Sequence, residues 1–338
     1  MPTFCRHNRF IERCPICSRT LPGNEPEAVP HRVRAGSGAA RRSSPPGGSR
    51  QRREGLRVRR EGRAAEDGYS SVLVPGLRAS SDAERLAREL AFSSARLAGL
   101  ALDPPGAYGR AGDVAAEGDF ERATWASFLL AYLSPSEDDE PFAGLDSVLA
   151  AAPEPRAVSG ELDGLLDGLS LGPRSSHEPG SGTRTLRAYV QWTDRAGGGE
   201  GAQEAAFTGD ASWPPARRFA RLFERLALPG LSRGARYDLL VALGRLGIYE
   251  LSGDSLHLGG PRSAGGEDAA TLAAKRVFGI GDPLLLDRRA ATLAEAVSVP
   301  LEALDLALFN WAAPERATLG FRPAEQPDDG SIAAALGL

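Results

Sequence analysis

Two stretches of this chain combine residue types that suit chemistry beside a phosphate group. The first, LPGLSRGARYDLLVALGRLG (228–247), predicts a tight Pro-Gly-Leu-Ser-Arg-Gly hairpin followed by an apolar helix. Such a hairpin aims backbone N–H groups outward, where an anion such as a DNA phosphate can sit. The second, GGEDAATLAAKRVFGIG (265–281), places the carboxylate of Asp268 just ahead of a helix. Together they predict a site that holds a phosphate close to an ionised acid.

Each of these features also has a purely structural interpretation. Asp268 stands where a helix N-cap is expected, and capping alone would explain it. Asp254, in Ser-Gly-Asp-Ser, is a second candidate acid, although aspartate is also a common turn residue. The hairpin over 228–234 can be a phosphate grip or a plain helix–turn–helix corner. Lys275, the only lysine of the chain, is either a functional cation or a solvated residue on a helix face.

All three cysteines lie within the first seventeen residues, in a pattern typical of a metal site. Cys5 and His7 precede a Cys-Pro-Ile-Cys knuckle at Cys14 and Cys17, and four such ligands complete a tetrahedral Zn²⁺ site. A closed site of this kind predicts structural zinc without catalysis, with His31 as the reserve ligand. The alternatives are a redox C-x-x-C, which lacks its usual βαβ setting here, and free thiols; a disulfide would leave one thiol over.

The elements around these motifs divide the chain into four parts. A zinc knuckle (1–21) precedes an Arg-rich linker (22–68) that has almost no large apolar residue, and we expect this linker to be disordered. It is either a basic tether for phosphates or a solvated spacer. A helical domain (69–315) and a C-terminal tail (316–338) follow. The formal net charge is −4, but residues 1–63 are strongly basic, so the remainder is acidic and any contact with DNA must be local.

Apolar periodicity and stop signals predict a mainly α fold. The segment 186–192 is ambiguous between helix and strand, and IYELSGDSLHLGG (248–260) predicts a small β-hairpin. We expect loops at 170–185 and 195–212. The predicted helices are 82–102, 119–133, 141–151, 160–169, 214–227, 234–246, 268–278, 283–297 and 300–312. No run is long enough to span a membrane and the N-terminus lacks a signal peptide, so we expect a cytoplasmic protein.

The order of these motifs resembles that of the helix-hairpin-helix DNA glycosylase superfamily. ATWASFLLAYL resembles the opening helix, LPGLSRGARYDLL the hairpin, DAATLAAKRVFGIG the helix led by the catalytic Asp, and LALFNWA the closing helix. With the N-terminal Cys/His cluster added, the chain resembles the alpha-glutamyl/putrescinyl thymine pyrophosphorylase group, in its bacterial zinc-knuckle clade. The likeness covers roughly 1–20 and 69–315.

Three departures from the superfamily pattern qualify what the resemblance implies. Ser232 replaces the second glycine of the hairpin. Gly234 stands where strand-cleaving members carry a lysine nucleophile, so we expect no strand cleavage. The gap from the hairpin to Asp268 is some sixteen residues longer than usual. If the extra residues are placed elsewhere in the alignment with the superfamily pattern, Asp254 becomes the candidate for the catalytic acid.

The resemblance implies an enzyme that flips a modified pyrimidine, such as those of phage DNA, out of the duplex. An Asp carboxylate would act at C1′ without strand cleavage, or pyrophosphate would leave a 5-substituted thymine. The alternative functions are a noncatalytic DNA-binding adaptor and a helical scaffold without nucleic acid. The implied catalytic residues are Asp268, Asp254 and Lys275, and the implied DNA contacts are Leu228, Gly230, Ser232, Arg233, Gly234, Arg276 and Asn310. Structural Zn²⁺ on Cys5, His7, Cys14 and Cys17 is the one expected cofactor.

Overall fold

The computed structural model describes residues 65–197, 199, 201–258 and 267–338. The chain divides into two compact units, Met1–Arg60 and Glu61–Leu338, and every described residue belongs to the second. The predicted zinc knuckle and most of the predicted linker lie outside the described residues. Within the described part, no helix is both long and apolar enough to span a membrane.

The described unit is mainly helical, as the sequence predicts. Its helices are α1 (Ser80–Leu102), α2 (Gly106–Ala116), α3 (Phe120–Leu133), α4 (Ala143–Ala151), the 3₁₀ turn η3 (Pro155–Ala157), α5 (Leu162–Asp167), α6 (Arg184–Gly197), α7 (Ala202–Thr208), α8 (Pro215–Arg225), α9 (Arg233–Arg245), α10 (Ala269–Phe278), α11 (Pro283–Ala296), α12 (Ala303–Ala312) and α13 (Gly330–Leu336).

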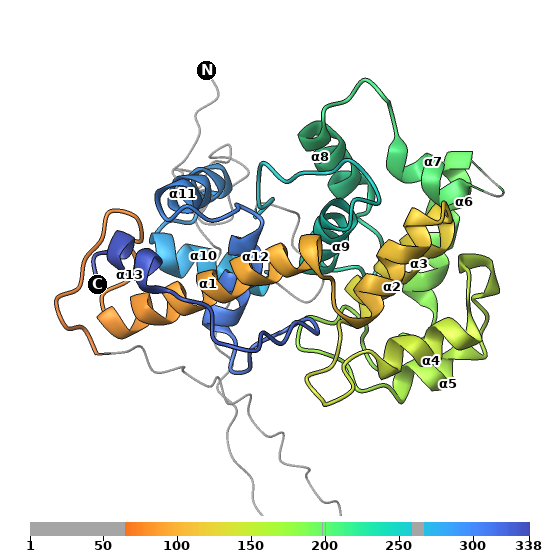
Figure 1. Ribbon diagram of the computed structural model, residues 1–338, viewed down its shortest axis with the longest axis horizontal. Helices are drawn as coiled ribbons and strands as arrows, with labels where there is room; N and C mark the ends of the chain where they lie inside the picture. The colour runs from red at the N-terminus through yellow and green to blue at the C-terminus, as the bar shows by residue number, and fades with distance from the viewer. Residues whose placement is uncertain (1–64, 198, 200, 259–266) are drawn as a thin grey trace, which may run out of the picture. The chain divides into compact units, whose positions relative to one another are not determined.

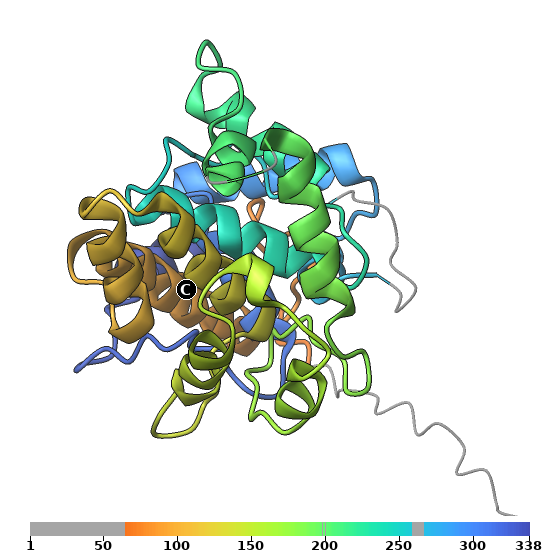
Figure 2. The ribbon, with the colours of Figure 1, turned by 90° about the vertical axis from the view of Figure 1, so that its right-hand side faces the viewer.

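These helices form two groups that meet at α9 (Figures 1 and 2). In one group, α1 packs against α12 and α13, and α12 packs against α10, which contacts α11. In the other, α3 packs against α2, α4 and α7, while α6 packs against α7. Helix α9 contacts α3 and α8 on one side and α1 on the other. The junction between the groups is therefore built around α9, the helix that follows the predicted hairpin.

A stack of aromatic side chains forms the core of the second group. Trp125, Phe128 and Tyr132 lie one helical turn apart on α3 and are fully buried. The ring of Phe128 stacks on that of Tyr189 from α6, with centroids 3.7 Å apart. The ambiguous segment 186–192 is thus helical, because Tyr189 and Trp192 must face α3 and α7 from one helix side.

The predicted β-hairpin at 248–260 is wrong. Residues 248–258 contain no strand, and the last two predicted residues lie outside the described part. The alternation of Leu256 and Leu258 suggested a strand, but both side chains are buried against the helices. The backbone of Leu256 finds side-chain partners instead of a second strand: its N–H donates to Asp287 at 3.1 Å, and its carbonyl accepts from Arg233 at 2.8 Å.

Three α-helices, α2, α7 and α13, were not predicted. Helix α2 begins directly after Pro105, in a stretch rich in glycine and alanine whose buried residues are mostly small. Helix α7 lies within 195–212, which the sequence assigns to a loop; that prediction is wrong because Ala206 and Phe207 are buried in the core. Residues 316–338, predicted as a tail, include α13, whose Ile332 and Leu336 are buried.

Candidate functional site

Asp268 is the N-cap of α10. Its Oδ2 atom accepts a hydrogen bond from the backbone N–H of Thr271 at 3.1 Å, which satisfies one of the free donors at the helix start. The Thr271 hydroxyl donates to the carbonyl of Leu258 at 3.2 Å and so ties the helix start to the preceding segment. The Asp268 side chain is 23% exposed, so solvent or a ligand can reach it.

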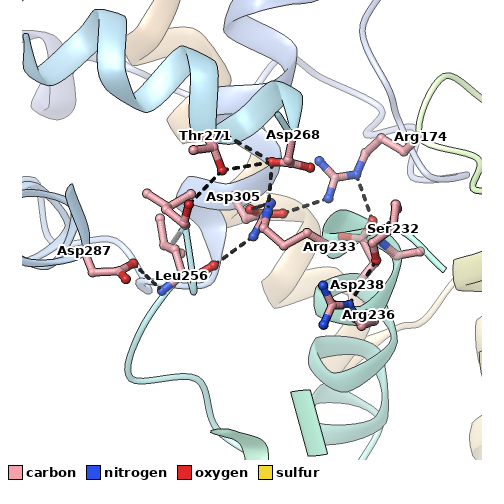
Figure 3. A network of polar contacts seen from close by, with 12 residues as sticks. Arg174, Ser232, Arg233, Arg236, Asp238, Leu256, Asp268, Thr271, Asp287 and Asp305 are labelled. Carbon is pink, nitrogen blue, oxygen red and sulfur yellow. Dashed lines mark hydrogen bonds and ion pairs between the residues drawn. The ribbon is translucent and has the colours of Figure 1, made fainter. Parts of the chain in front are cut away.

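Arg233, the first residue of α9, holds Asp268 from the other side (Figure 3). Its Nε donates to Oδ2 of Asp268 at 2.9 Å, and its Nη1 donates to the carbonyl of Leu256 at 2.8 Å. Its Nη2 donates to Oδ1 of Asp305. The sequence placed Arg233 among the DNA contacts, but its guanidinium is buried and directed at three internal acceptors.

Arg174 and Asp305 complete a buried network. Arg174 comes from the loop between α5 and α6; its Nε donates to Oδ2 of Asp238 at 2.8 Å and its Nη2 to Oδ2 of Asp305 at 2.7 Å. Asp305 on α12 is 1% exposed and binds one arginine with each oxygen. We call the set Arg174, Arg233, Asp238, Asp268 and Asp305 the Arg–Asp network. It joins the two helical groups, and its formal charge is one negative unit.

The network keeps Asp268 ionised. Burial alone would raise the pKa of this carboxyl, but the positive charges of Arg233 and Arg174 and the hydrogen bonds from Arg233 and Thr271 outweigh that effect and hold the pKa below its usual value. The same carboxylates raise the pKa of both arginines against the opposing effect of burial. Asp268, Arg174 and Arg233 are therefore charged at neutral pH.

The second oxygen of Asp268 faces the start of α9. Among the described residues, none donates a hydrogen bond to this Oδ1 atom, whereas Oδ2 accepts from Arg233 and Thr271. A Cβ placed on Gly234 would lie 3.8 Å from Oδ1 and 3.1 Å from Nη2 of Arg174. A residue without a side chain at 234 thus lets Arg174 and Asp268 approach the helix start.

The hairpin before α9 has the tight geometry that the sequence predicts. The N–H of Leu231 donates to the carbonyl of Leu228 at 3.1 Å, and Gly230 has a φ of 78° that favours glycine. Ser232 caps α9 by accepting from the N–H of Ala235 at 3.1 Å. Its own N–H is not open to a ligand in this conformation, because it donates to the hydroxyl of Ser176 at 3.1 Å.

Asp254, the competing acid, lies outside the Arg–Asp network. It is exposed on the segment between α9 and α10, and no hydrogen bond or ion pair of its carboxylate is present among the described residues. The structure therefore brings Asp268, and not Asp254, beside the start of α9.

Lys275 and Arg276 lie further along α10. Lys275 forms an ion pair with Glu267, and the guanidinium of Arg276 lies 4.8 Å from the ring centroid of Trp311. Both line a groove of about 750 Å³ that Leu272 and Ile280 also border. Both basic residues lie in the last turn of α10, and the groove runs along this helix from Ala269 to Gly281.

Asn310 has a structural role in this fold. It is buried, its Oδ1 accepts from the N–H of Ala317 at 2.9 Å, and its Nδ2 donates to the carbonyl of the same residue at 3.2 Å. These two bonds use its amide to anchor the C-terminal segment on α12, so the amide is not directed at the Arg–Asp network.

The predicted zinc ligands Cys5, His7, Cys14 and Cys17, and the reserve ligand His31, lie outside the described residues. Over the described ranges there is no cluster of three or more His, Cys, Asp or Glu side chains that could hold a metal ion.

Sequence reasoning missed three members of the network: Arg174, Asp238 and Asp305. They lie in a loop, in the middle of α9 and on α12, so no local spacing connects them. Asp305 interrupts the apolar helix around it while being 1% exposed, and a carboxylate on an apolar helix face was the one available signal.

The comparison with known families identifies the segment that contains this network. Residues 173–321 match the family model of alpha-glutamyl/putrescinyl thymine pyrophosphorylase clade 3. This family segment, which is less than half of the chain, begins one residue before Arg174 and includes every member of the Arg–Asp network as well as the hairpin. Neither the curated proteins nor the solved structures include a significant match to the chain.

Proposed function

We propose that this chain modifies a thymine-type base of DNA, with Asp268 as the reacting carboxylate. The observation that carries the proposal is the placement of Asp268: an ionised carboxylate at the junction of the two helical groups, with one oxygen fixed by Arg233 and the other facing the start of α9. The family matched over 173–321 is named for thymine carrying glutamyl or putrescinyl groups and for pyrophosphorylase action.

The chemistry that fits these residues is displacement of pyrophosphate from a 5-substituted thymine. A base inside a duplex is not accessible to a carboxylate, so the target base is flipped out. A primary amine then forms a C–N bond at the carbon attached to C5, while the C–O bond to pyrophosphate breaks and pyrophosphate leaves with the electron pair. Oδ1 of Asp268 accepts the proton that the amine nitrogen loses.

The other residues support this step by electrostatics. Fixing Oδ2 through Arg233 and Thr271 orients Oδ1 and avoids reorganisation during the reaction. The negative formal charge of the network attracts a cationic amine. Lys275 and Arg276, beside the groove along α10, supply positive charge for the departing pyrophosphate. Residue 234 is a glycine and not the lysine nucleophile of strand-cleaving enzymes. No Schiff base therefore forms at this position, and the DNA strand stays intact.

The test is turnover of a duplex oligonucleotide that carries a 5-hydroxymethyluracil pyrophosphorylated on its hydroxyl, with putrescine as the amine. Nucleoside mass spectrometry and pyrophosphate release report the product. We expect Asp268→Asn to lower the rate by about 100-fold or more, as loss of a general base does. Asn also caps helices well, so α10 should persist.

Asp282→Asn is the matched control, because Asp282 caps α11 in the same way, by accepting from the N–H groups of Leu284 and Leu285. Its rate should equal that of the wild type, and Asp254→Asn should behave likewise. Full activity in Asp268→Asn would overturn the assignment. Abasic sites in place of a substituted thymine would show attack at C1′, and DNA binding without turnover would show a noncatalytic adaptor; either result contradicts the proposal.

A further inference from the structure

The buried state of Arg233 leaves the hairpin without the cation that the sequence placed there. Its guanidinium is directed at Asp268, Asp305 and the carbonyl of Leu256. Arg236, one turn further on, is also buried and donates to the carbonyl of Phe223 at 3.1 Å. A hairpin that grips a phosphate in an acidic domain needs exposed positive charge close by, because phosphate contacts supply most of the affinity for DNA.

Helix α6 brings two exposed arginines to the hairpin. Its second residue, Thr185, lies directly against Gly230: a Cβ on that glycine would be 2.2 Å from Oγ1 of Thr185. Arg184 and Arg187 lie in the same first turn of α6 as Thr185, and both are exposed. Within the described residues neither side chain forms an ion pair, so their charges are not neutralised by a partner there. Asp163, a carboxylate at this helix start, accepts the N–H of Thr183 at 2.8 Å.

Helix α8 brings a third arginine to the same place. Arg225 ends α8 five residues before Gly230, and its guanidinium lies 5.6 Å from the ring centroid of Trp192 on α6. It is exposed and has no ion-pair partner in the described part of the chain. Arg221, one turn earlier, contributes less because it pairs with Glu224 at 3.0 Å.

We propose that Arg184, Arg187 and Arg225 form a phosphate rim around the 228–232 hairpin and bind the sugar–phosphate backbone of duplex DNA. This proposal rests on the proposed function for its choice of ligand. The contacts Thr185–Gly230 and Trp192–Arg225 fix the two helices that carry the rim relative to the hairpin. Arg184 and Arg187 are about 4.5 Å apart along the helix axis, so they can contact neighbouring phosphates of one strand.

The rim accounts for binding by an acidic domain. Residues 64–338 carry a formal charge near −14, which repels DNA at long range. Three guanidinium groups that have no ion-pair partner among the described residues give a small positive surface beside the hairpin, and this surface acts within about a Debye length of 8–10 Å. Contacts to the backbone position the duplex and carry no sequence information, so the rim is expected to bind all sequences equally.

The experiment measures DNA binding of the full chain by fluorescence anisotropy, on two unrelated duplexes, between 50 and 200 mM salt. The test variant is Arg184→Gln/Arg187→Gln/Arg225→Gln. The slope of log K against log salt is negative, and each phosphate contact contributes about −0.9 to it. The triple variant should therefore have a shallower slope, smaller in magnitude by about 2.7, on both duplexes.

The matched control is Arg78→Gln/Arg88→Gln/Arg288→Gln. It removes the same charge from exposed arginines on and near α1 and α11, in the other helical group. Its slope should equal that of the wild type. Equal slopes in the test variant and the wild type, or equal losses in both triple variants, would overturn the rim while leaving the proposed function standing. Absence of salt-dependent DNA binding by the wild type would overturn both.

Discussion

Nε of Arg233 lies 2.9 Å from Oδ2 of Asp268, and this ion pair joins the first residue of α9 to the N-cap of α10. The two helix starts are thirty-five residues apart in the chain. The pair fixes the distance between the hairpin and the carboxylate, the two features that the sequence singled out. Asp305 and Leu256 hold the same arginine from the opposite side, so the geometry does not depend on one contact.

Replacement of Asp305 tests the energetic role of the network. Asp305→Asn leaves two buried arginines short of a negative partner, and we expect the free energy of unfolding to fall by about 3–5 kcal/mol. Urea unfolding followed by circular dichroism measures the loss.

The control for Asp305 is Asp146→Asn, which breaks an ion pair with Arg110 whose side chains are both more than half exposed. That change should cost less than about 1 kcal/mol. Similar losses in the two variants would show that the network contributes no more than a surface pair.

A pair of glycine substitutions tests the contact between the segment before α1 and the end of α10. A Cβ on Gly76 would lie 2.0 Å from the carbonyl oxygen of Arg276 and 2.6 Å from the N atom of Gly279. Both neighbours are backbone, so Gly76→Ala should lower stability by about 2 kcal/mol or more. In α2, nothing lies within 4 Å of a Cβ on Gly112, and Gly112→Ala should raise stability by about 0.5–1 kcal/mol. Thermal unfolding of both variants checks the opposite signs.

His257 should make stability depend on pH below about 6.5. Burial lowers the pKa of its imidazole from 6.5, helped by Arg233 and opposed by Asp287, Asp254 and Glu224. The unfolded chain therefore binds more protons below pH 6.5 than the folded chain, so folding stability rises with pH up to about 6.5 and falls as pH drops through the folded pKa. Unfolding free energies from urea titrations at several pH values test this.

The variant for that test is His257→Asn. His257 has a φ of 52°, a backbone conformation that asparagine tolerates, so the exchange removes the titrating ring without adding strain. Loss of stacking on Phe223, whose ring centroid is 4.3 Å away, lowers the stability at every pH, while the slope of about one proton disappears. An unchanged slope would assign the pH dependence to other groups.

The Cys/His cluster near the N-terminus stays a prediction from the sequence, and metal analysis can test it. We expect the full chain, purified without added zinc, to hold about one equivalent of Zn²⁺, and Cys14→Ser to lose it. His7→Ala should also lose the metal, whereas His31→Ala should retain it. Less than about half an equivalent of zinc in the wild type would contradict the site. Loss of zinc in His31→Ala but not in His7→Ala would show that His31, and not His7, is the fourth ligand.

Sequence periodicity identified the large helices because their buried faces carry large apolar side chains. Trp125, Phe128 and Tyr132 mark α3, and Phe219, Leu222 and Phe223 mark α8. Helix α2 has few such residues, so its position depends on its contact with α3 and not on local pattern. The segment around Leu256 misled the prediction because side chains of Asp287 and Arg233 replace the partner strand that alternation implies.

Only those parts of the candidate site that are marked by neighbouring residues in the sequence could be predicted. Asp268 stood out as a helix N-cap, and the hairpin stood out by its Pro-Gly turn. The contribution of Arg174, Asp238 and Asp305 depends on three segments meeting at α9, which no single window of sequence contains. For the same reason the sequence assigned Arg233 to DNA: nothing beside it indicates the acids that bury it.

The packing of α12 on α1 means that the segment recognised by the family model is smaller than the unit that can fold. Arg85 on α1 donates to the carbonyls of Asn310 and Ala313, and Nε1 of Trp311 donates to the carbonyl of Asp82 at 2.9 Å. A fragment cut to residues 173–321 would lose these partners and expose the apolar side of the helix that carries Asp305. Recombinant fragments intended to keep the carboxylate in place therefore have to start upstream of α1.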